Sequence, residues 1–543
     1  MKRKAVAAVL TAVMVASMFT GCGSDKGSSS AKSTSAASAA NDTVDEDGKV
    51  NGIMYQEGLP LVDEGDYTFS IFCDDSSESG EFIMLDEFKK QTNVDVDLKI
   101  YPYETATERL NLDLNSGDYA DVIGGWTLSD NAILTYGVNQ GVFIPLEDYF
   151  EKYCPNISAI LDLPGVREKM TAPDGHIYTI PYVCADSTVG YSPYINTKWL
   201  ENVGMSMPTT TDEFEAVLKA FKEQDANGNG DASDEIPFST DPNNKHIEAM
   251  AGYFGLPMNK LGIAIQNEKV VYGGVSDTYR EFLSWFHKLY AEGLVDVELY
   301  TQDSSTWEGK GNQDLYGVSI AYGSGEFTGI PAAEERGDFD SMPVLNTDKG
   351  GIWMRDTEGF SVYRTQAVIT NKAEHPEIIC RWFDNAFALE NGIGCNRGPV
   401  GVIVNKEDDG YHAIDTTTLS EEDQEKYSWG NLWPQSLPKY LPADFEFVEE
   451  HPMYDEKKAT EEAYEANLTK EIIPSYWIDL DKIDTFSDTN TAIKDFFEQQ
   501  QAQFVCGELD IDNDADWQAY VDGMYSLGLE DWVATQGIEE IAK

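Results

Sequence analysis

Hydrophobic and polar residues alternate along the body of the chain in a way that predicts strands separated by helices. Tyr67–Cys73 is a short apolar run typical of a buried strand, and Glu81–Gln91 carries three apolar residues at helical spacing. Val94–Ile100 then alternates apolar and polar residues, as a half-buried strand does. A second helix and a short strand ending at Gly124 repeat this order. The pattern predicts an open α/β sheet.

Two side chains stand directly after predicted strands of this sheet. Asp74 follows the first strand, and Trp126 follows the strand that ends at Gly124. Ligands of open α/β sheets bind beyond the carboxyl ends of the strands. We therefore expect Asp74 and Trp126 at a binding site.

The N-terminus has the pattern of an export signal. Three basic residues, Lys2 to Lys4, precede an apolar stretch from Ala5 to Phe19 that is too short to span a membrane, and small residues and Cys22 follow. Residues 22–50 are rich in Ser and Ala and contain no aromatic side chain, so they cannot bury enough surface to fold. We expect residues 1–21 to be a signal peptide, residues 22–50 a disordered tether, and residues 51–543 the folded body.

Composition narrows the function further. The chain has 543 residues, of which 41% are hydrophobic, so it can bury a large core. Its 96 acidic residues against 38 basic ones give a net charge of −58, which repels nucleic acid and anionic membranes. Six cysteines beyond Cys22 lie far apart without metal-binding spacing, and we expect mostly buried free thiols.

Five segments stand in a recognisable order along the chain: Leu114–Val122, Asp174–Pro181, Asn196–Leu200, Pro208–Phe214 and Trp517–Leu529. In this order they resemble the family 1 extracellular solute-binding proteins, the sugar-binding lipoproteins of bacterial ABC importers. The last of these segments resembles the branch of alginate-oligosaccharide and LplA-type binders. Phe19–Cys22 resembles the cleavage site of bacterial lipoproteins, in which the Cys is diacylated.

The resemblance implies a two-lobed periplasmic-binding-protein-like α/β fold of type II, with a hinge and a helical C-terminal region. We expect one lobe from residues 66–185 and 358–395, and the other from 190–355 and 400–543. A carbohydrate, in particular an oligosaccharide, would bind in the cleft, and the closed monomer would deliver it to the permease subunits. Cys22 would anchor the protein by lipid, with palmitate among the chains, to the outer face of the bacterial cytoplasmic membrane.

A loop after the helix that begins at Pro208–Phe214 has the chemistry of a calcium site. Oxygen-bearing side chains alternate there and a Gly permits a sharp turn, as in an EF-hand, although Glu235 falls one residue early. The resemblance implies that such a site is structural and lies away from the ligand. We expect side-chain ligands from Asp225, Asn227, Asn229, Asp234 and Glu235, and a backbone carbonyl ligand from Asp231.

A sugar site needs aromatic faces for the apolar side of the rings and planar polar groups for the hydroxyls. Residues at strand ends, near the expected lobe crossovers and in Gly-bounded or Pro-bounded loops meet this need. The candidate ligand-binding residues are Asp74, Trp126, Tyr182, Tyr191, Tyr322, Trp353, Arg355, Arg397 and Trp433.

Other functions stay open at this point. The chain lacks the GxSxG, HExxH and Walker motifs, so we expect no enzyme activity. Paired carboxylates of a surface-tethered glycoside hydrolase cannot be recognised among 96 acids without geometry. A binding protein for a peptide or another non-sugar solute is a further alternative.

Overall fold

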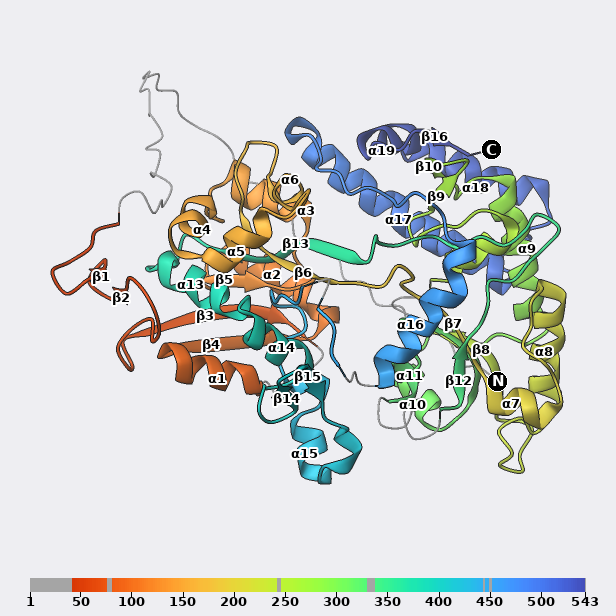
Figure 1. The fold of residues 1–543 in the computed structure, drawn as a ribbon. Coiled ribbons are helices and arrows are strands. Elements are labelled where there is room, and N and C mark those ends of the chain that lie inside the picture. The colour runs from red at the N-terminus through yellow and green to blue at the C-terminus, as the bar shows by residue number, and fades with distance from the viewer. Residues whose placement is uncertain are drawn as a thin grey trace, which may run out of the picture. The chain divides into compact units, whose positions relative to one another are not determined.

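The computed structural model describes residues 42–75, 81–241, 246–329, 337–442, 445–448 and 452–542. The predicted signal peptide, Cys22 and most of the predicted tether lie outside these residues. Two main sheets organise the described chain (Figure 1). We call each sheet with the helices that share its core a lobe.

The first sheet has the strand order β4-β3-β5-β13-β6. β3 runs parallel to β4 and β5, whereas β13 is antiparallel to β5 and β6. This confirms the predicted βαβ unit, with α1 between β3 and β4. Its strands are β3 Tyr67–Asp74, β4 Val94–Tyr101, β5 Val122–Gly124, β6 Thr179–Ala185 and β13 Phe360–Ile369.

Helices pack on this sheet because each turns one apolar face toward it. The core between them includes Ile71, Phe88 and Trp382, all fully buried. The helices of the first lobe are α1 Ile83–Thr92, α2 Tyr103–Ser116, α3 Asp130–Ala132, the π-helix η2 Ile133–Asn139, α4 Glu147–Tyr153, α5 Pro155–Leu161, α6 Val166–Met170, α13 Pro376–Ala386 and α14 Leu389–Arg397.

The second sheet has the order β12-β7-β11-β8, with β11 parallel to β8 and antiparallel to β7. Thr210 caps the helix α8, because its hydroxyl accepts the N–H of Glu213 at 3.2 Å. The strands and helices here are β7 Ser192–Asn196, α7 Thr197–Val203, α8 Thr211–Glu223, β8 Ile236–Thr240, η3 Ile247–Phe254, α9 Asp277–Ala291, α10 Ser304–Asn312, β11 Tyr316–Ala321, α11 Gly325–Thr328 and β12 Phe339–Ser341.

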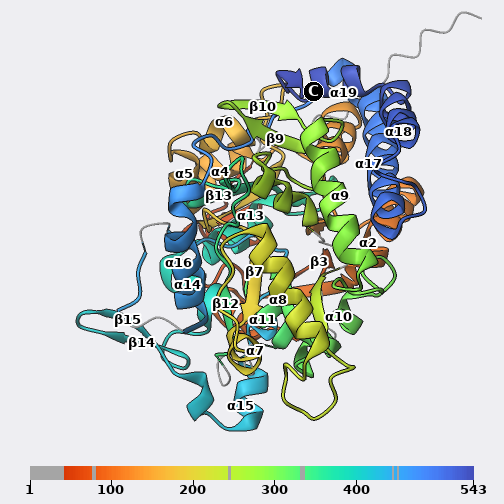
Figure 2. The ribbon, with the colours of Figure 1, turned by 90° about the vertical axis from the view of Figure 1, so that its right-hand side faces the viewer.

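The C-terminal helices join the core of this second lobe (Figure 2). α17 packs along α9, and a small sheet β16-β10-β9 closes the group. The elements are β9 Ile263–Gln266, β10 Lys269–Tyr272, α16 Pro452–Tyr464, η6 Glu465–Asn467, η7 Leu480–Lys482, α17 Ile483–Cys506, α18 Asp514–Ser526, α19 Leu529–Thr535 and β16 Glu540–Ile541.

The expected assignment of residues 400–543 to the second lobe is wrong for part of that range. Trp433 and Leu437 lie in the first core, and Tyr440 pairs with Val183 of β6. Ile478 also packs on the first sheet. These apolar side chains pack with residues of the first sheet and its helices. The extra elements are β14 Val404–Glu407, β15 Gly410–Ala413, η4 Thr416–Thr418, α15 Glu421–Lys426 and η5 Trp429–Asn431.

The folded body also begins before the expected boundary at residue 51. Val50 is fully buried and belongs to the hairpin of β1 (Lys49–Val50) and β2 (Met54–Tyr55). Asp42 accepts a hydrogen bond from the hydroxyl of Tyr153 at 2.8 Å. The last nine residues of the predicted tether are therefore held against the first lobe.

The chain crosses between the sheets at residues 186–191 and 356–359, and the two crossovers are bonded to each other. The N–H of Asp356 donates to the carbonyl of Thr188 at 3.0 Å, and the hydroxyl of Thr357 donates to the backbone carbonyl of Ser187 at 3.0 Å. This pairing brings together residues about 170 positions apart.

The cysteines are as predicted in the described residues. The six cysteines are free thiols, and all but Cys506 are buried, as expected. Within the described ranges, no helix combines the length and the apolar character needed to cross a membrane.

Candidate functional site

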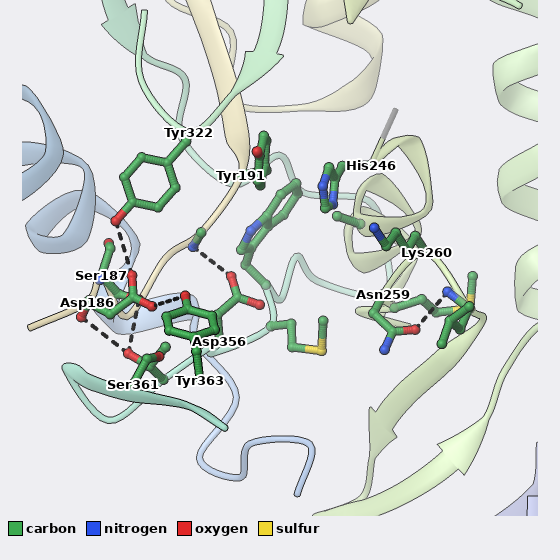
Figure 3. A pocket seen from close by; sticks show the side chains of 17 residues that line it. Asp186, Ser187, Tyr191, His246, Asn259, Lys260, Tyr322, Asp356, Ser361 and Tyr363 are labelled. Atoms are coloured by element: carbon green, nitrogen blue, oxygen red, sulfur yellow. Dashed lines mark hydrogen bonds between the residues drawn. The ribbon is translucent and has the colours of Figure 1, made fainter. Parts of the chain in front are cut away.

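A cavity of about 530 Å³ lies where the crossovers meet β11, β13 and the segment around η3. Figure 3 shows its side chains converging from these separate elements. The lining residues are Asp186, Ser187, Gly190, Tyr191, His246, Ala249, Met258, Asn259, Lys260, Leu261, Tyr322, Trp353, Met354, Asp356, Thr357, Ser361 and Tyr363.

Asp186 joins the two sheets at this cavity. Its carboxylate accepts the hydroxyl of Tyr322, at the end of β11, at 3.1 Å and that of Tyr363, in β13, at 2.7 Å (Figure 3). Burial, with Asp186 alongside, raises the pKa of both tyrosines, so the phenols stay protonated and donate. One carboxylate thus ties together a strand of each lobe.

Asp356 presents a carboxylate to the cavity. One oxygen accepts the N–H of Gly190 at 2.6 Å. The side chain is solvent-accessible through the cavity, yet protein surrounds it closely enough that burial raises its pKa to about 6. Gly190 permits this approach, because a Cβ there would overlap the carboxylate.

Aromatic rings form much of the wall. Tyr191 stacks on His246 with ring centroids 4.1 Å apart and meets Tyr322 edge-on at 6.1 Å. Trp353 is only 1% exposed but borders the same cavity. Burial, followed by the nearby Lys260, lowers the pKa of His246 to about 4, so its ring is neutral at pH 7.

Lys457, from α16, stands behind this wall. Its ammonium donates to the carbonyls of Gly190 and Tyr322, the latter at 2.7 Å, and lies 4.0 Å from the Tyr322 ring. Burial lowers its pKa to about 8. This lysine holds the first crossover against the end of β11.

Trp126 stands beside the cavity rather than in its lining. It is 45% exposed and meets Tyr363 edge-on at 5.3 Å and Tyr182 at 6.4 Å, while Tyr182 and Tyr363 stack at 5.5 Å. The rings therefore continue from the cavity edge to an exposed indole.

A second exposed indole, that of Trp429, is linked to Tyr182 through Lys439. The ammonium of Lys439 is 5.4 Å from the Tyr182 ring and 5.6 Å from that of Trp429, and Trp429 is 44% exposed. Burial lowers the pKa of Lys439 to about 8. A buried cation thus connects the two rings.

Asp74, which we expected to contact the ligand, lies in the protein interior instead. It is fully buried, and its carboxylate accepts the N–H groups of Trp126 at 3.0 Å and Thr127 at 2.5 Å. Gly125, with φ +133°, leaves room for it. Asp74 therefore positions Trp126.

The structure brings some predicted ligand residues together and separates others. Tyr191, Tyr322 and Trp353 line the cavity, and Trp126 and Tyr182 adjoin it through Tyr363. The prediction that Trp433 is an aromatic platform for the ligand is wrong. Its side chain is fully buried, and its ring stacks on that of Trp382 with centroids 5.7 Å apart.

Neither predicted arginine lines the cavity. The Arg355 guanidinium pairs with Glu465 at 3.1 Å and donates to the Thr469 carbonyl at 3.2 Å. Arg397 lies 5.9 Å from the ring of Phe447. These contacts belong to the protein's own packing.

Sequence reasoning missed several residues of the cavity and its surroundings. Asp186 directly follows β6, so the rule for strand ends that selected Asp74 could have found it. Trp429 lies in the same aromatic loop as Trp433. His246, Lys260 and Asp356 give no signal of this kind, because only the fold brings them to one place.

The predicted calcium loop lies elsewhere and folds through its own oxygens. Asp225 accepts the N–H of Gly230 at 3.0 Å, and the side-chain oxygens of Asn227 and Asn229 accept N–H groups of the loop at 3.0 and 2.8 Å. Asp234 accepts both asparagine amides, at 3.3 and 2.7 Å. These bonds shape the turn that a metal loop needs.

Glu235 is the unusual member of this loop. One oxygen accepts the N–H of Ala226 at 2.8 Å, but Oε2 is buried and has no hydrogen-bond partner among the described residues. Burial raises its pKa. An unpartnered carboxylate oxygen beside Asp234 fits a hard cation. In the described ranges, three metal-type ligands approach within 4.8 Å of one another only at Glu407, Asp409 and His412.

The comparisons with known proteins define the class. The model of the bacterial extracellular solute-binding protein family matches residues 77–392, more than half of the chain. The chain belongs to this family, and its fold is the two-lobed fold of type II solute-binding proteins.

The fructooligosaccharide ABC transporter substrate-binding protein FusA of Streptococcus pneumoniae serotype 4 is 33% identical over 335 residues, 60% of this chain and 61% of FusA. The chain thus matches about three fifths of that relative's length. The structure of S. pneumoniae FusA with kestose has a TM-score of 0.76 at 26% identity, covering 86% of this chain and 98% of that one. The FusA EF-hand mutant with fructo-nystose gives 0.74 at 27%, with the same coverage.

Proposed function

We propose that this protein binds an oligosaccharide outside the cell and delivers it to the permease of an ABC importer. The observation that carries the proposal is the cavity of about 530 Å³ where the two crossovers meet, which combines aromatic rings with accessible carboxylates. Its volume falls in the range of small-molecule sites. The similarity to FusA, a fructooligosaccharide-binding transport protein, supports a carbohydrate ligand.

The cavity supplies what a sugar requires. The rings of Tyr191, Tyr322 and Tyr363 offer faces or edges to the apolar side of a pyranose or furanose. Asp356 has a carboxylate oxygen beyond the one bonded to Gly190, and it would accept sugar hydroxyls.

The exposed indoles extend the surface for further sugar units. Trp126, which meets the Tyr182 ring, and Trp429, which is linked to that ring through Lys439, would act as platforms, and Trp429 would take the role first expected of Trp433. A chain of several sugars would reach from the cavity to these rings. An oligosaccharide therefore matches the surface better than a single sugar.

Ligand binding would act on the crossovers. Tyr322 and Tyr363 come from different sheets and share the carboxylate of Asp186, so a ligand touching both would hold the lobes closed. A hinge at residues 186–191 and 356–359 would allow this closure, and the permease would then recognise the closed form.

The loop from Asp225 to Glu235 would hold a structural calcium ion. The carboxylates of Asp225, Asp234 and Glu235 and the side-chain oxygens of Asn227 and Asn229 would bind it, with the carbonyl of Asp231. The buried Oε2 of Glu235 supports this, as does the existence of an EF-hand mutant of FusA. The ion would supply an electrostatic cross-link between loop residues, with no role in chemistry.

The protein would be held at the membrane by a diacylated Cys22, which lies outside the described residues. From there it would face the exterior and meet the permease subunits as a monomer. It would release its ligand unchanged, without enzyme activity.

Calorimetry of the purified protein with a panel of oligosaccharides tests the proposal. We expect saturable binding of at least one oligosaccharide and no product after prolonged incubation. Product formation would favour a glycoside hydrolase. Failure of every glycan to bind, with binding of peptides or another solute, would replace the proposed ligand.

A further inference from the structure

We infer that the cavity selects neutral oligosaccharides and rejects uronic acids, with Asp356 as the carboxylate that accepts ligand hydroxyls. This inference rests on the proposed function and specifies its ligand class. The inference follows from the charged side chains that line the cavity and from the hydrogen bonds that the neighbouring Arg355 and Lys457 already make.

The charged lining is mainly acidic. Asp186 and Asp356 contribute two carboxylates, whereas Lys260 is the one cation among the described lining residues, since the buried His246 is neutral at pH 7. Burial lowers the pKa of Lys260 too, which weakens its hold on a proton. The carboxylate of an acidic sugar would enter beside like charges.

One acid next to the lining adds only in part to this field. The Glu326 carboxylate accepts the N–H of Tyr322 at 2.9 Å, and burial raises the pKa of Glu326 to about 7, so it carries only part of a charge at pH 7. The whole chain carries a net charge of −58. Like-charge juxtaposition is a strong means of rejecting a ligand, because neither charge is then compensated.

The usual partner of a sugar carboxylate is missing from the described lining. A guanidinium binds a carboxylate through two parallel hydrogen bonds. The guanidinium of Arg355, however, donates to the carboxylate of Glu465 and to the carbonyl of Thr469. Lys457 gives its protons to two backbone carbonyls. Both cations therefore stabilise the walls instead of facing a ligand.

Asp356 is positioned to accept hydrogen bonds from the hydroxyls of a sugar. Its bond to the N–H of Gly190 fixes the carboxylate while leaving the second oxygen toward the cavity (Figure 3). Hydrogen bonds to an ionised acceptor are stronger than neutral ones, so a sugar hydroxyl gains most from a charged acceptor. A uronate offers fewer donors at this point and adds a repelling charge.

Calorimetry with two sets of ligands tests the inference. The neutral set holds kestose, nystose, maltotriose and galactotriose, and the acidic set holds trigalacturonate and a mannuronate trimer. We expect a neutral oligosaccharide to bind, and the acidic trimers to bind at least about 100-fold more weakly at both low and physiological salt. A uronate that binds as tightly as the best neutral sugar would overturn the inference while leaving the proposed function intact.

Two variants locate the effect. Asp356→Asn should weaken neutral binding by about tenfold or more, since it keeps an acceptor for Gly190 but removes the charge. Asp118→Asn, an exposed acid outside the cavity lining, is the matched control and should bind as the wild type. Thermal unfolding of both variants verifies that they fold. Unchanged affinity in folded Asp356→Asn would refute the role of Asp356.

A null result completes the test. If no saccharide of either set bound, the proposed function would fail and the inference with it.

Discussion

Replacing Trp126 by Ala separates a ligand platform from a structural tryptophan. The indole is 45% exposed, and its loop is held by the buried Asp74 through N–H groups of the backbone, which Ala retains. The substitution therefore removes the ring without removing what shapes the loop.

The size of the effect follows from the exposed area. A tryptophan buries up to ~250 Å², so the 45% that is exposed corresponds to about 110 Å². At ~25 cal/mol per Å², covering all of it would contribute about 2.8 kcal/mol. A sugar covers one face, which leaves about 2 kcal/mol, or about thirtyfold in affinity.

The cost in stability is smaller than for a core residue. Trp126 touches Tyr363 and Tyr182 by its edge, and aromatic pairs of this kind contribute about 1 kcal/mol each, so unfolding should become about 1–2 kcal/mol easier. Trp433→Ala is the matched contrast, because that ring is fully buried and its loss costs about 3–5 kcal/mol.

Calorimetry with the best ligand of the panel and thermal unfolding of the unliganded proteins give the two readouts. Trp126→Ala should lose affinity and keep most of its stability. Equal affinity in wild type and variant would refute the platform, and a stability loss as large as that of Trp433→Ala would show that Trp126 is structural.

Four other outcomes are expected. Chelation by EDTA should lower the free energy of unfolding by about 2.7 kcal/mol if free calcium was 100 times its dissociation constant, and Glu235→Gln should reduce this shift; an unchanged melting temperature with no calcium by elemental analysis would contradict the site. Cys22→Ser should release the protein into the medium, and continued membrane retention, measured by fractionation, would reject the lipid anchor. The association constant for the ligand should fall by up to about tenfold per pH unit below about pH 6, because hydroxyls favour the charged form of Asp356, whose pKa is raised to about 6, and Asp356→Asn should flatten this slope in calorimetry. Gly125→Ala should destabilise the fold by about 1–3 kcal/mol in denaturant titration, since its φ of +133° and the Asp74 carboxylate leave no room for a Cβ; wild-type stability would show that the loop can relax.

The sequence alone determined the features that depend on neighbouring residues. The strand, helix and strand from Tyr67 to Tyr101 follow from apolar periods of two and 3.6 residues, and Thr210 caps α8 through a bond that spans three positions. The turn of the Asp225–Glu235 loop likewise closes on its own side chains. Each of these depends on short-range geometry that the order of residues already contains.

Only the tertiary structure decided which side chains face a ligand. Trp429 and Trp433 stand four positions apart in one loop, yet Trp433 stacks on Trp382 in the core while Trp429 stays exposed beside Lys439. Asp186 and Asp356 reach one cavity from opposite crossovers. Burial depends on contacts with distant parts of the chain, and the local pattern of hydrophobic residues carries no information about which distant residues will make them.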